Sequence, residues 1–497
     1  MPVTTLHPDF VKRSPQWKYM RDCIDGEDTI KKAGEAYLPR AGGSSKEMYE
    51  AYKLRARFIN YTKRTLDGLH GLIFRRNPVV ESPSDEWFSR VLKNIDKRGH
   101  SLYQFLSDSI YDTMITGWGG FLADHPETEP DLDVFTAEKQ DVRPYLRYYK
   151  AESIRNWRYG VINGLEQLVM VTLVEKWDKN TDLFEHDFTT VYRVLAIIDG
   201  VYHQFLYTED SDKPVRDIIP KKNGQPMDTI PFFTVPGDSP DIPMFLDLAK
   251  CNVGHYQKTA DYENGLHLTT IPTGYVTGHD KYIDPDTKEE ETVYLGWDQF
   301  LMFKEEGAKV GVLNYAGEGL THCETALSIA MSDMAILGSR LVTPEKGTSE
   351  SADSAKIHRA GENAKLAKFA KNISETVTKA VSLIADWMGI KGVVSIELCT
   401  DYDTLTFDPN ALNSLANLSS QSKLPLPYVF HNLKNGEYTP DSATLKEYIA
   451  LLNMEAAGVD MMTEAELYSQ FQKNPKLLEG LFKAPGKENN EPEENKQ

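Results

Sequence analysis

The chain has 497 residues and carries 55 basic against 74 acidic side chains, a formal net charge of −19. This acidic balance argues against a general nucleic-acid clamp, which would be basic, although DNA could slide past such a surface without adhering. The 40% hydrophobic fraction suffices for sizeable cores, and the length predicts several structural regions. We find no apolar run long enough to span a membrane and no apolar stretch typical of a signal peptide, so we expect a cytoplasmic protein without membrane association.

Helical patterns dominate the N-terminal part. Over residues 46–75 apolar side chains recur at helical spacing, with basic residues on the other sides. That basic face fits either nucleic acid or solvent, and we favour a solvated face. The basic residues are Lys53, Arg55, Arg57, Lys63 and Arg64.

A second helix is predicted over residues 101–117, followed by a short strand at GFLAD. The GWGG sequence at 117–120 resembles a phosphate loop only weakly, because it lacks the lysine and hydroxyl residue of that motif. We interpret it as a helix end and a turn. Residues 144–206 then alternate in polarity and are rich in Val, Tyr and Leu, which predicts strands with hairpin turns at Asn163-Gly164 and Asp199-Gly200.

The second half alternates helices with a small β segment. We predict a helix over 244–266, short strands over 267–316 and a returning helix over 317–342. A polar loop at 343–352 precedes a helix over 353–388, about 54 Å long at about 1.5 Å per residue. Gly361 is a plausible kink point in it. The helix carries an apolar stripe of Leu366, Phe369, Ala370, Ile373, Val377, Ala380, Val381, Ile384 and Trp387.

The remaining residues continue this α+β organisation. Residues 393–399 form a strand, 409 onward form small helices, and the last residues are low in apolar content and predicted to be disordered. The four cysteines are dispersed without CxxC spacing, so we expect buried thiols rather than disulfides or a zinc site. They are Cys23, Cys251, Cys323 and Cys399.

No reacting centre is evident. The GxGxxG, Walker lysine, HExxH and GxSxG motifs are all missing from the sequence. His322, Cys323 and Glu324 are adjacent on a helix and therefore point in different directions, so we interpret their proximity as chance. We expect no enzyme, no metal and no cofactor. One alternative is a metal-dependent nuclease that uses Asp401, Asp403 and Asp408, although a second acidic cluster is missing.

The order of elements resembles a bacteriophage portal protein, the ring through which DNA enters and leaves a tailed-phage capsid. Four stretches look like a portal-like family long described only as a domain of unknown function. They are YLP (37–39), RARFINYTKRTLDGLHGLIFRRNP (55–78), RPYLRYYKAESIRNWR (143–158) and FLDLAKCNVGHYQKTAD (245–261). The resemblance covers about residues 30–460, and its motifs are individually weak.

The resemblance implies an α+β portal fold with wing, stem, clip and crown regions. The wing would comprise 1–243 (N-terminal helices and β-rich body) and also 353–408, the long kinked helix and return strand. The stem helices would be 244–266 and 317–342, around a clip at 267–316. LVTPEKGTSESAD would contain the tunnel loop, 343–352, here rich in Ser and Thr and short of glycine. The crown would be 409–483, and 484–497 a disordered tail.

The resemblance also implies a function. Portals form dodecameric rings, so the loop would repeat around a channel for double-stranded DNA and contact phosphates without reading sequence. Expected partners are a terminase, a head-completion or adaptor protein, and the major capsid and scaffold proteins. The clip's acidic turn at 284–291 is either a terminase contact or a solvated hairpin tip. The protein would reside at the portal vertex of the virion, and in the host cytoplasm during assembly. The channel-facing loop residues would be Glu345, Lys346, Thr348, Ser349, Glu350 and Ser351.

Overall fold

A computed structural model of the chain forms two compact units, Met1–Thr400 and Asp401–Gln497. The structure describes residues 2–126, 134–180, 182, 184–209, 211, 213–270, 273–277, 307, 309–313, 317–338, 352–402, 414, 417, 425–435, 439 and 443–456.

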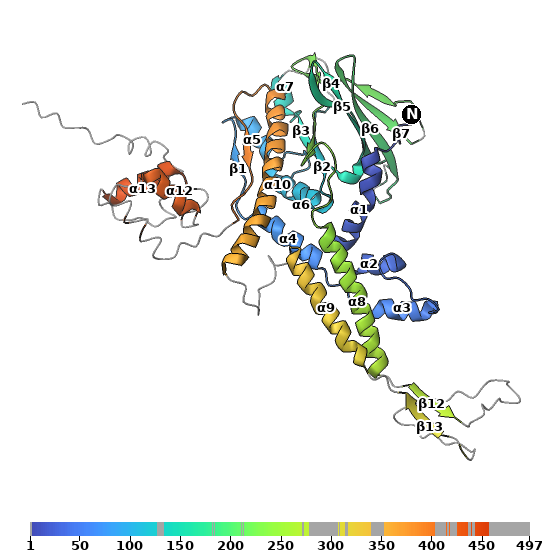
Figure 1. Ribbon diagram of the computed structural model, residues 1–497. Coiled ribbons are helices and arrows are strands. Elements are labelled where there is room, and N and C mark those ends of the chain that lie inside the picture. The colour runs from blue at the N-terminus through green and yellow to red at the C-terminus, as the bar shows by residue number, and fades with distance from the viewer. Residues whose placement is uncertain are drawn as a thin grey trace, which may run out of the picture. The chain divides into compact units, whose positions relative to one another are not determined.

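Helices make up most of the first 140 residues (Figure 1). The pattern predicted over 46–75 is divided into α3 and α4, because Ala56 is extended and Asn60 caps the second helix by accepting from the Lys63 N–H. Side-chain caps also start α3, α5 and α6, at Ser45, Asp85 and Ser101. The helices are α1 (Pro8–Asp25), α2 (Glu27–Ala33), the 3₁₀ turn η1 (Gly34–Ala36), α3 (Lys46–Arg55), α4 (Tyr61–Ile73), α5 (Glu86–Lys93), α6 (Leu102–Thr116) and α7 (Val134–Lys139).

Two antiparallel sheets form the β-rich body. One has the order β11-β2-β3, and the other is the meander β4-β5-β6-β7-β8. The strands are β2 (Gly119–Asp124), β3 (Tyr145–Lys150), β4 (Ile154–Ile162), β5 (Leu165–Asp178), β6 (Phe188–Ile198), β7 (Val201–Thr208), β8 (Arg216–Ile218) and β11 (Phe232–Val235). The 3₁₀ turn η2 (Ala151–Ser153) joins β3 to β4, and the short pair β9 (Lys221–Lys222) and β10 (Gln225–Pro226) precedes β11.

Both predicted hairpin turns are confirmed. Asn163 and Gly164 join β4 to β5 with φ of 54° and 80°, and Asp199 and Gly200 join β6 to β7 with φ of 50° and 80°. Two consecutive positive φ values define the turn type that matches strand twist. The predicted helix end is also confirmed, because Gly117 is the left-handed C-cap of α6 with φ 75°.

The two sheets and α6 form three layers. Along β3, successive side chains point to opposite faces, so Tyr148 faces Phe121 and α6 while Tyr149 faces the five-stranded sheet. Between the sheets Trp118 lies 4.6 Å from Trp157 and 6.4 Å from Trp17 of α1, measured between ring centroids. This core also holds Leu122, Leu195 and Tyr202, among other buried side chains.

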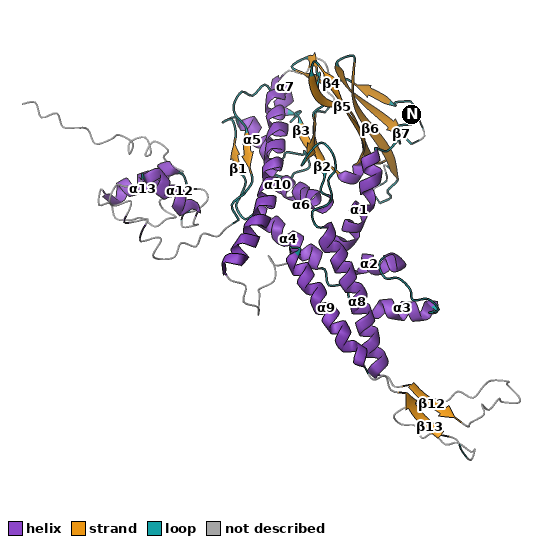
Figure 2. Cartoon of the chain, viewed as in Figure 1, coloured by secondary structure: helices purple, strands orange, loops and turns teal. Residues whose placement is uncertain are grey.

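The second half of unit 1 follows the predicted order. Figure 2 shows two long helices, α8 and α9, side by side, and a third, α10, beside the strand-rich part of the unit. All nine side chains of the predicted α10 stripe are buried. The elements are α8 (Leu246–Thr270), β12 (Thr273–Thr277), β13 (Lys309–Leu313), α9 (Glu318–Ile336), α10 (Ala352–Trp387) and β14 (Ser395–Glu397), and β14 pairs with β1 (Val79–Glu81).

Unit 2 is helical where the structure describes it. It contains α12 (Leu426–Asn435) and α13 (Leu445–Ala456). Thr444 and Glu447 form a reciprocal capping box at the start of α13, each side chain accepting from the other's N–H at 3.2 and 2.8 Å. Phe430 packs on Tyr448 at 5.3 Å between centroids.

All four cysteines are free thiols, with Cys23 buried and the other three half-buried. Within the described residues, no helix has an apolar stretch of the length and low charge that a membrane span requires.

Candidate functional site

The polar loop between α9 and α10 is the site that the sequence singles out. Its predicted residues, 345, 346 and 348–351, lie outside the described residues. Gly361 lies within α10, and its role as a kink stays a prediction. The structure does describe the helices on either side of this loop.

Both flanking helices reach α4. At the end of α9, Gly338 has φ +129°, and a Cβ placed there would lie 3.5 Å from Thr65 Cγ2 on α4. Helix α10 also contacts α4. A side chain at 338 would be strained by this backbone conformation, so glycine allows the chain to leave α9 close against α4.

Helices α8 and α9 form an antiparallel hairpin. Tyr262 donates a hydrogen bond to Glu324 at 2.9 Å, and further along a Cβ at Gly265 would lie 2.9 Å from Leu320 Cδ2. The same pairing continues into the strands, where Thr273 lies opposite Leu313 and Thr277 opposite Lys309. In both the hairpin and the β12-β13 ladder, residues of the first segment contact residues of the second in reverse chain order.

A polar clasp holds α8 against the start of α4. Asn252 is fully buried and accepts hydrogen bonds from the N–H and the hydroxyl of Thr62, both at 3.1 Å. Its amide donates to the Ile59 carbonyl at 2.8 Å. Asn60, next in the chain, donates to the carbonyls of Cys23 and Ile24 at the end of α1. Two asparagines thus fasten the turn before α4 to α1 and α8.

The end of α3 and the segment that follows it contact the acidic side of α8. Arg57 forms an ion pair with Glu263, and Arg55 donates to the Asn264 side chain at 3.3 Å. Tyr52 donates to Asp261 at 2.6 Å, and burial together with this bond raises the pKa of Tyr52. The interpretation of a solvated face is confirmed for Arg57, whose side chain is 68% exposed, and for Lys63 and Arg64, while Arg55 is half-buried.

Helix α9 exposes large apolar side chains. Ile329 is 57% exposed and Ile336 is 59% exposed, and Met331 and Leu337 are also exposed. Of its described side chains only Ala330 and Met334 are buried. A helix that is apolar on most of its circumference is normally covered on more than one side.

Helix α10 is fixed to the body along its C-terminal half. The Thr378 hydroxyl accepts from the Ile396 N–H at 3.0 Å, and one turn earlier Ser374 accepts from the Leu398 N–H at 3.0 Å. At its end, the Trp387 indole donates to the Lys221 carbonyl at 3.0 Å. The long helix is thereby tied to the return strand β14 and to β9.

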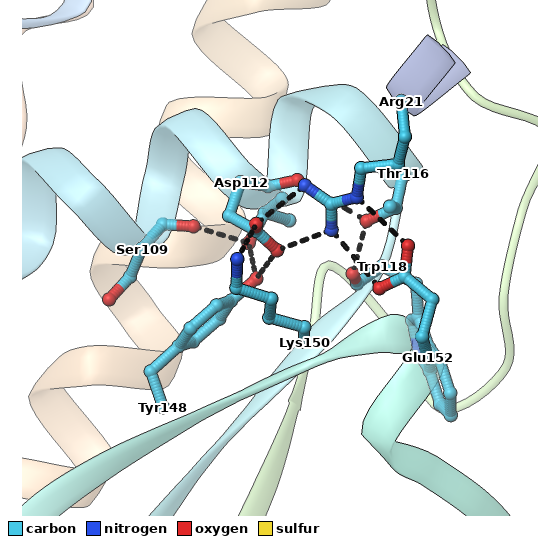
Figure 3. Close-up of polar contacts among 9 residues, drawn as sticks. Arg21, Ser109, Asp112, Thr116, Trp118, Tyr148, Lys150 and Glu152 are labelled. Atoms are coloured by element: carbon cyan, nitrogen blue, oxygen red, sulfur yellow. Dashed lines mark hydrogen bonds and ion pairs between the residues drawn. The ribbon is translucent and has the colours of Figure 1, made fainter. Parts of the chain in front are cut away.

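An ionic cluster joins α1, α6, β3 and η2 (Figure 3). Arg21 donates four hydrogen bonds of 2.7–3.0 Å, two to Asp112 and two to Glu152. Burial alone would lower the pKa of Arg21, but the bonds to both carboxylates raise it. Tyr148 and Lys150 also approach Asp112, at 3.1 and 3.3 Å. The sequence did not signal this cluster, since its members are far apart in the chain.

The residues of the nuclease alternative lie mostly outside the described part of the chain. Asp401 is described, whereas Asp403 and Asp408 lie outside the described residues. Glu324, from the sequence cluster with His322 and Cys323, pairs with Tyr262 across the α8–α9 hairpin. Within the described residues, no three His, Cys, Asp or Glu side chains are grouped to hold a metal ion.

Taken as a fold, the chain is an α+β protein in which a β-rich body carries a helical hairpin and a long helix. Residues 244–388, from α8 through α10, match a family described as "Domain of unknown function (DUF4055)". No curated protein matches the chain.

Two solved structures resemble the chain over most of its length. One is described as "Neck of empty GTA particle computed with C6 symmetry", with 12% identity and a TM-score of 0.36, covering 80% of this chain and 94% of that one. The other is described as "Neck of native GTA particle computed with C12 symmetry", with 12% identity and a TM-score of 0.33, covering 80% and 95%.

Proposed function

We propose that the chain is the subunit of a bacteriophage portal ring, which passes double-stranded DNA into and out of the capsid and has no catalytic activity of its own. The observation that carries this proposal is the α8–α9 hairpin, whose second helix exposes Ile329 and Ile336. A second copy of the chain would cover these side chains. A head-to-tail contact of this kind, repeated until it closes, gives a cyclic ring.

The order of elements supports the same proposal. The α8–α9 hairpin ends in the β12-β13 ladder, which would be the clip that docks a terminase during packaging and head-completion or adaptor proteins afterwards. The family match covers the same α8–α10 stretch. The proposal keeps the predicted wing, stem, clip and crown regions.

The loop between α9 and α10 would repeat around the channel. Lys346, flanked by Glu345 and Glu350, gives each subunit one cation and two carboxylates there. Contact with phosphate would then be weak, salt-sensitive and independent of sequence. The motor energy would come from the terminase partner, and the capsid and scaffold proteins would surround the ring at one vertex of the virion.

The mass and shape of the full-length protein test the proposal. Native mass spectrometry and negative-stain electron microscopy should show a ring with a central hole of roughly 20 Å or more, the width that duplex DNA needs. A monomer or dimer that persists after addition of scaffold protein would contradict it. Magnesium-dependent DNA cleavage that Asp401→Ala abolishes would favour the nuclease instead.

A further inference from the structure

Strand β3 has an open edge. It is the last strand of the β11-β2-β3 sheet. Ala123 of β2 donates its N–H to Pro231 before β11, and Leu146, which faces Ala123, donates its N–H to the Ile95 carbonyl. These two bonds show which residues of β3 direct their backbone groups toward β2 and which direct them away from it, because antiparallel neighbours exchange hydrogen bonds only at every second pair. The backbone groups of Leu146, Tyr148 and Lys150 therefore point away from β2.

Beyond the Leu146 bond this edge has no partner among the described residues. The N–H and C=O of Tyr148 and the N–H of Lys150 make no hydrogen bond there. An unpaired edge of this kind is a template for one more strand. The hydrogen bond from the Leu146 N–H to the Ile95 carbonyl is of the kind that an added strand would make along this edge.

A cleft of about 750 Å³ runs along this edge. All six consecutive residues of β3, Tyr145 to Lys150, line it. Side chains of consecutive strand residues point to opposite faces, so a cleft that touches them all must follow the backbone edge. The other walls come from the loop at 96–100, from α6 and from β5. Strand β3 therefore borders the cleft along all six of its residues.

The charges around the cleft favour an acidic occupant. Three of its carboxylates already have partners inside the protein: Asp112 binds Arg21, Glu175 binds Arg193 and Asp96 binds His100. Arg98 and Lys176, both exposed at the cleft, have no ion-pair partner among the described residues. Lys97 is a further exposed cation at the cleft, Lys150 and Arg147 also lie there but pair with Asp112 and Glu175, and Asp108 is the remaining carboxylate.

We propose that the open edge of β3 binds an extended acidic peptide segment of a partner protein and takes it up as a fourth strand of the β11-β2-β3 sheet. Backbone hydrogen bonds to Tyr148 and Lys150 would hold the segment, and Arg98 and Lys176 would select its acidic side chains. From Leu146 to Lys150 the paired length is about 14 Å at about 3.4 Å per residue. The proposal goes beyond the portal function and does not rest on it.

Fluorescence anisotropy with the full-length protein tests this proposal. The probe is a labelled octapeptide that alternates Glu and Val, and its controls are the Lys–Val counterpart and a Glu–Val peptide with a central proline. We expect the acidic peptide to bind on the order of tenfold more tightly than either control, with affinity falling as salt rises. Equal binding of the acidic and basic peptides would overturn the role of charge.

Two variants of one residue separate the backbone from the side chain. Lys150 has φ −65°, the value that proline adopts, so Lys150→Pro removes the edge N–H without backbone strain. Lys150→Met removes the charge and keeps the N–H. We expect Lys150→Pro to weaken peptide binding on the order of tenfold more than Lys150→Met. Equal effects would show that no strand is added at this edge.

A charge reversal away from β3 keeps the test independent of how Lys150→Pro folds. Arg98→Glu with Lys176→Glu should abolish binding of the acidic peptide and allow the Lys–Val peptide to bind. If Lys150→Pro alters only the self-association of the protein and no peptide binds, a second copy of the chain covers this edge and the proposal is wrong.

Discussion

Asn252 and Thr62 lie 190 residues apart in the sequence, yet the Asn252 side-chain oxygen accepts both the N–H and the hydroxyl of Thr62 at 3.1 Å. Both residues are fully buried. The contact fixes the first turn of α4 to the second turn of α8, and α4 is the helix that both flanks of the α9–α10 loop contact. The helical hairpin and the frame of the loop are thereby linked through one amide side chain.

Asn252→Ala should destabilise unit 1 by about 2–4 kcal/mol, because it removes three hydrogen bonds and leaves the buried Thr62 N–H without a partner. Urea unfolding followed by the fluorescence of the buried core tryptophans measures this change, at one fixed protein concentration because assembly would shift the midpoint. Lys250→Ala, on an exposed position of the same helix, should change the free energy of unfolding by less than about 0.5 kcal/mol. Comparable losses in the two variants would show that the clasp contributes little.

Elements whose sequence contains a clear local pattern, such as an apolar stripe or a glycine at a turn, could be predicted from the sequence. The α10 stripe, the Gly117 helix end and the two Xaa-Gly hairpin turns are each encoded within a few residues. The helix at Pro8–Asp25 carried a conflicting signal, since Pro15 lies inside it and its apolar residues are mixed with charged ones. Its stability comes from burial of Trp17 and Met20 against the rest of the unit.

The polar contacts could not be predicted, because each depends on residues distant in sequence. Arg21 and Asp112 are 91 residues apart, and Arg57 and Glu263 are 206 apart. A charged helix face looks the same in sequence whether it meets water or an acidic helix. For the loop between α9 and α10 the situation is the reverse of that for the polar contacts. The sequence predicts its residues as a site, while the structure describes only the helices that flank it.

Arg21→Met tests the ionic cluster of Figure 3. It leaves Asp112 and Glu152 close together without their shared cation, and we expect a loss of about 3 kcal/mol in the free energy of unfolding. Lys150→Met removes a cation from the same cluster, but this side chain is 61% exposed and its loss should cost less than about 1 kcal/mol. Chemical denaturation of both variants decides the ranking, and the reverse order would contradict it.

Gly120 should tolerate no side chain. A Cβ there would lie 2.2 Å from Cζ of Phe232, whose ring is packed between the two sheets, so Gly120→Ala should destabilise unit 1 by about 2–3 kcal/mol. Gly71→Ala is the matched control, because Gly71 lies in α4 with open space around its Cα. There the better helix propensity of alanine should stabilise by up to about 1 kcal/mol. Thermal unfolding of the two variants should therefore shift in opposite directions.

Stability should fall in two separate pH ranges. Burial lowers the pKa of His70 and of His255 below the ordinary value of 6.5. The unfolded chain then binds more protons than the folded chain below about pH 6.5, so stability declines as the pH drops through that value. Burial opposes the ionisation of Glu175, but Arg193 and Arg147 lower the pKa of this carboxyl from 4.5 to about 2. Its contribution, about 3 kcal/mol, is lost between pH 4.5 and pH 2.

Two variants assign these pH ranges. His70→Gln should reduce the slope of unfolding free energy against pH near pH 6 and leave the acidic range unchanged. Glu175→Gln should do the opposite. Unfolding free energies measured from pH 8 to pH 2 provide the test, and an unchanged slope near pH 6 in His70→Gln would remove this histidine from the explanation.

The exposed face of α9 gives the last prediction. Ile329 and Ile336 are seven residues apart and therefore lie on one side of the helix. If a second copy covers them in a ring, lysine at both positions places two charges in an apolar contact and should dissociate the assembly, while a lone chain would tolerate charges on an exposed face. Ser328→Lys is the control, because it adds the same charge about 100° further around the helix. Sedimentation velocity should show subunits for the double variant and an intact ring for Ser328→Lys, and a ring that survives both changes would place the subunit contact elsewhere.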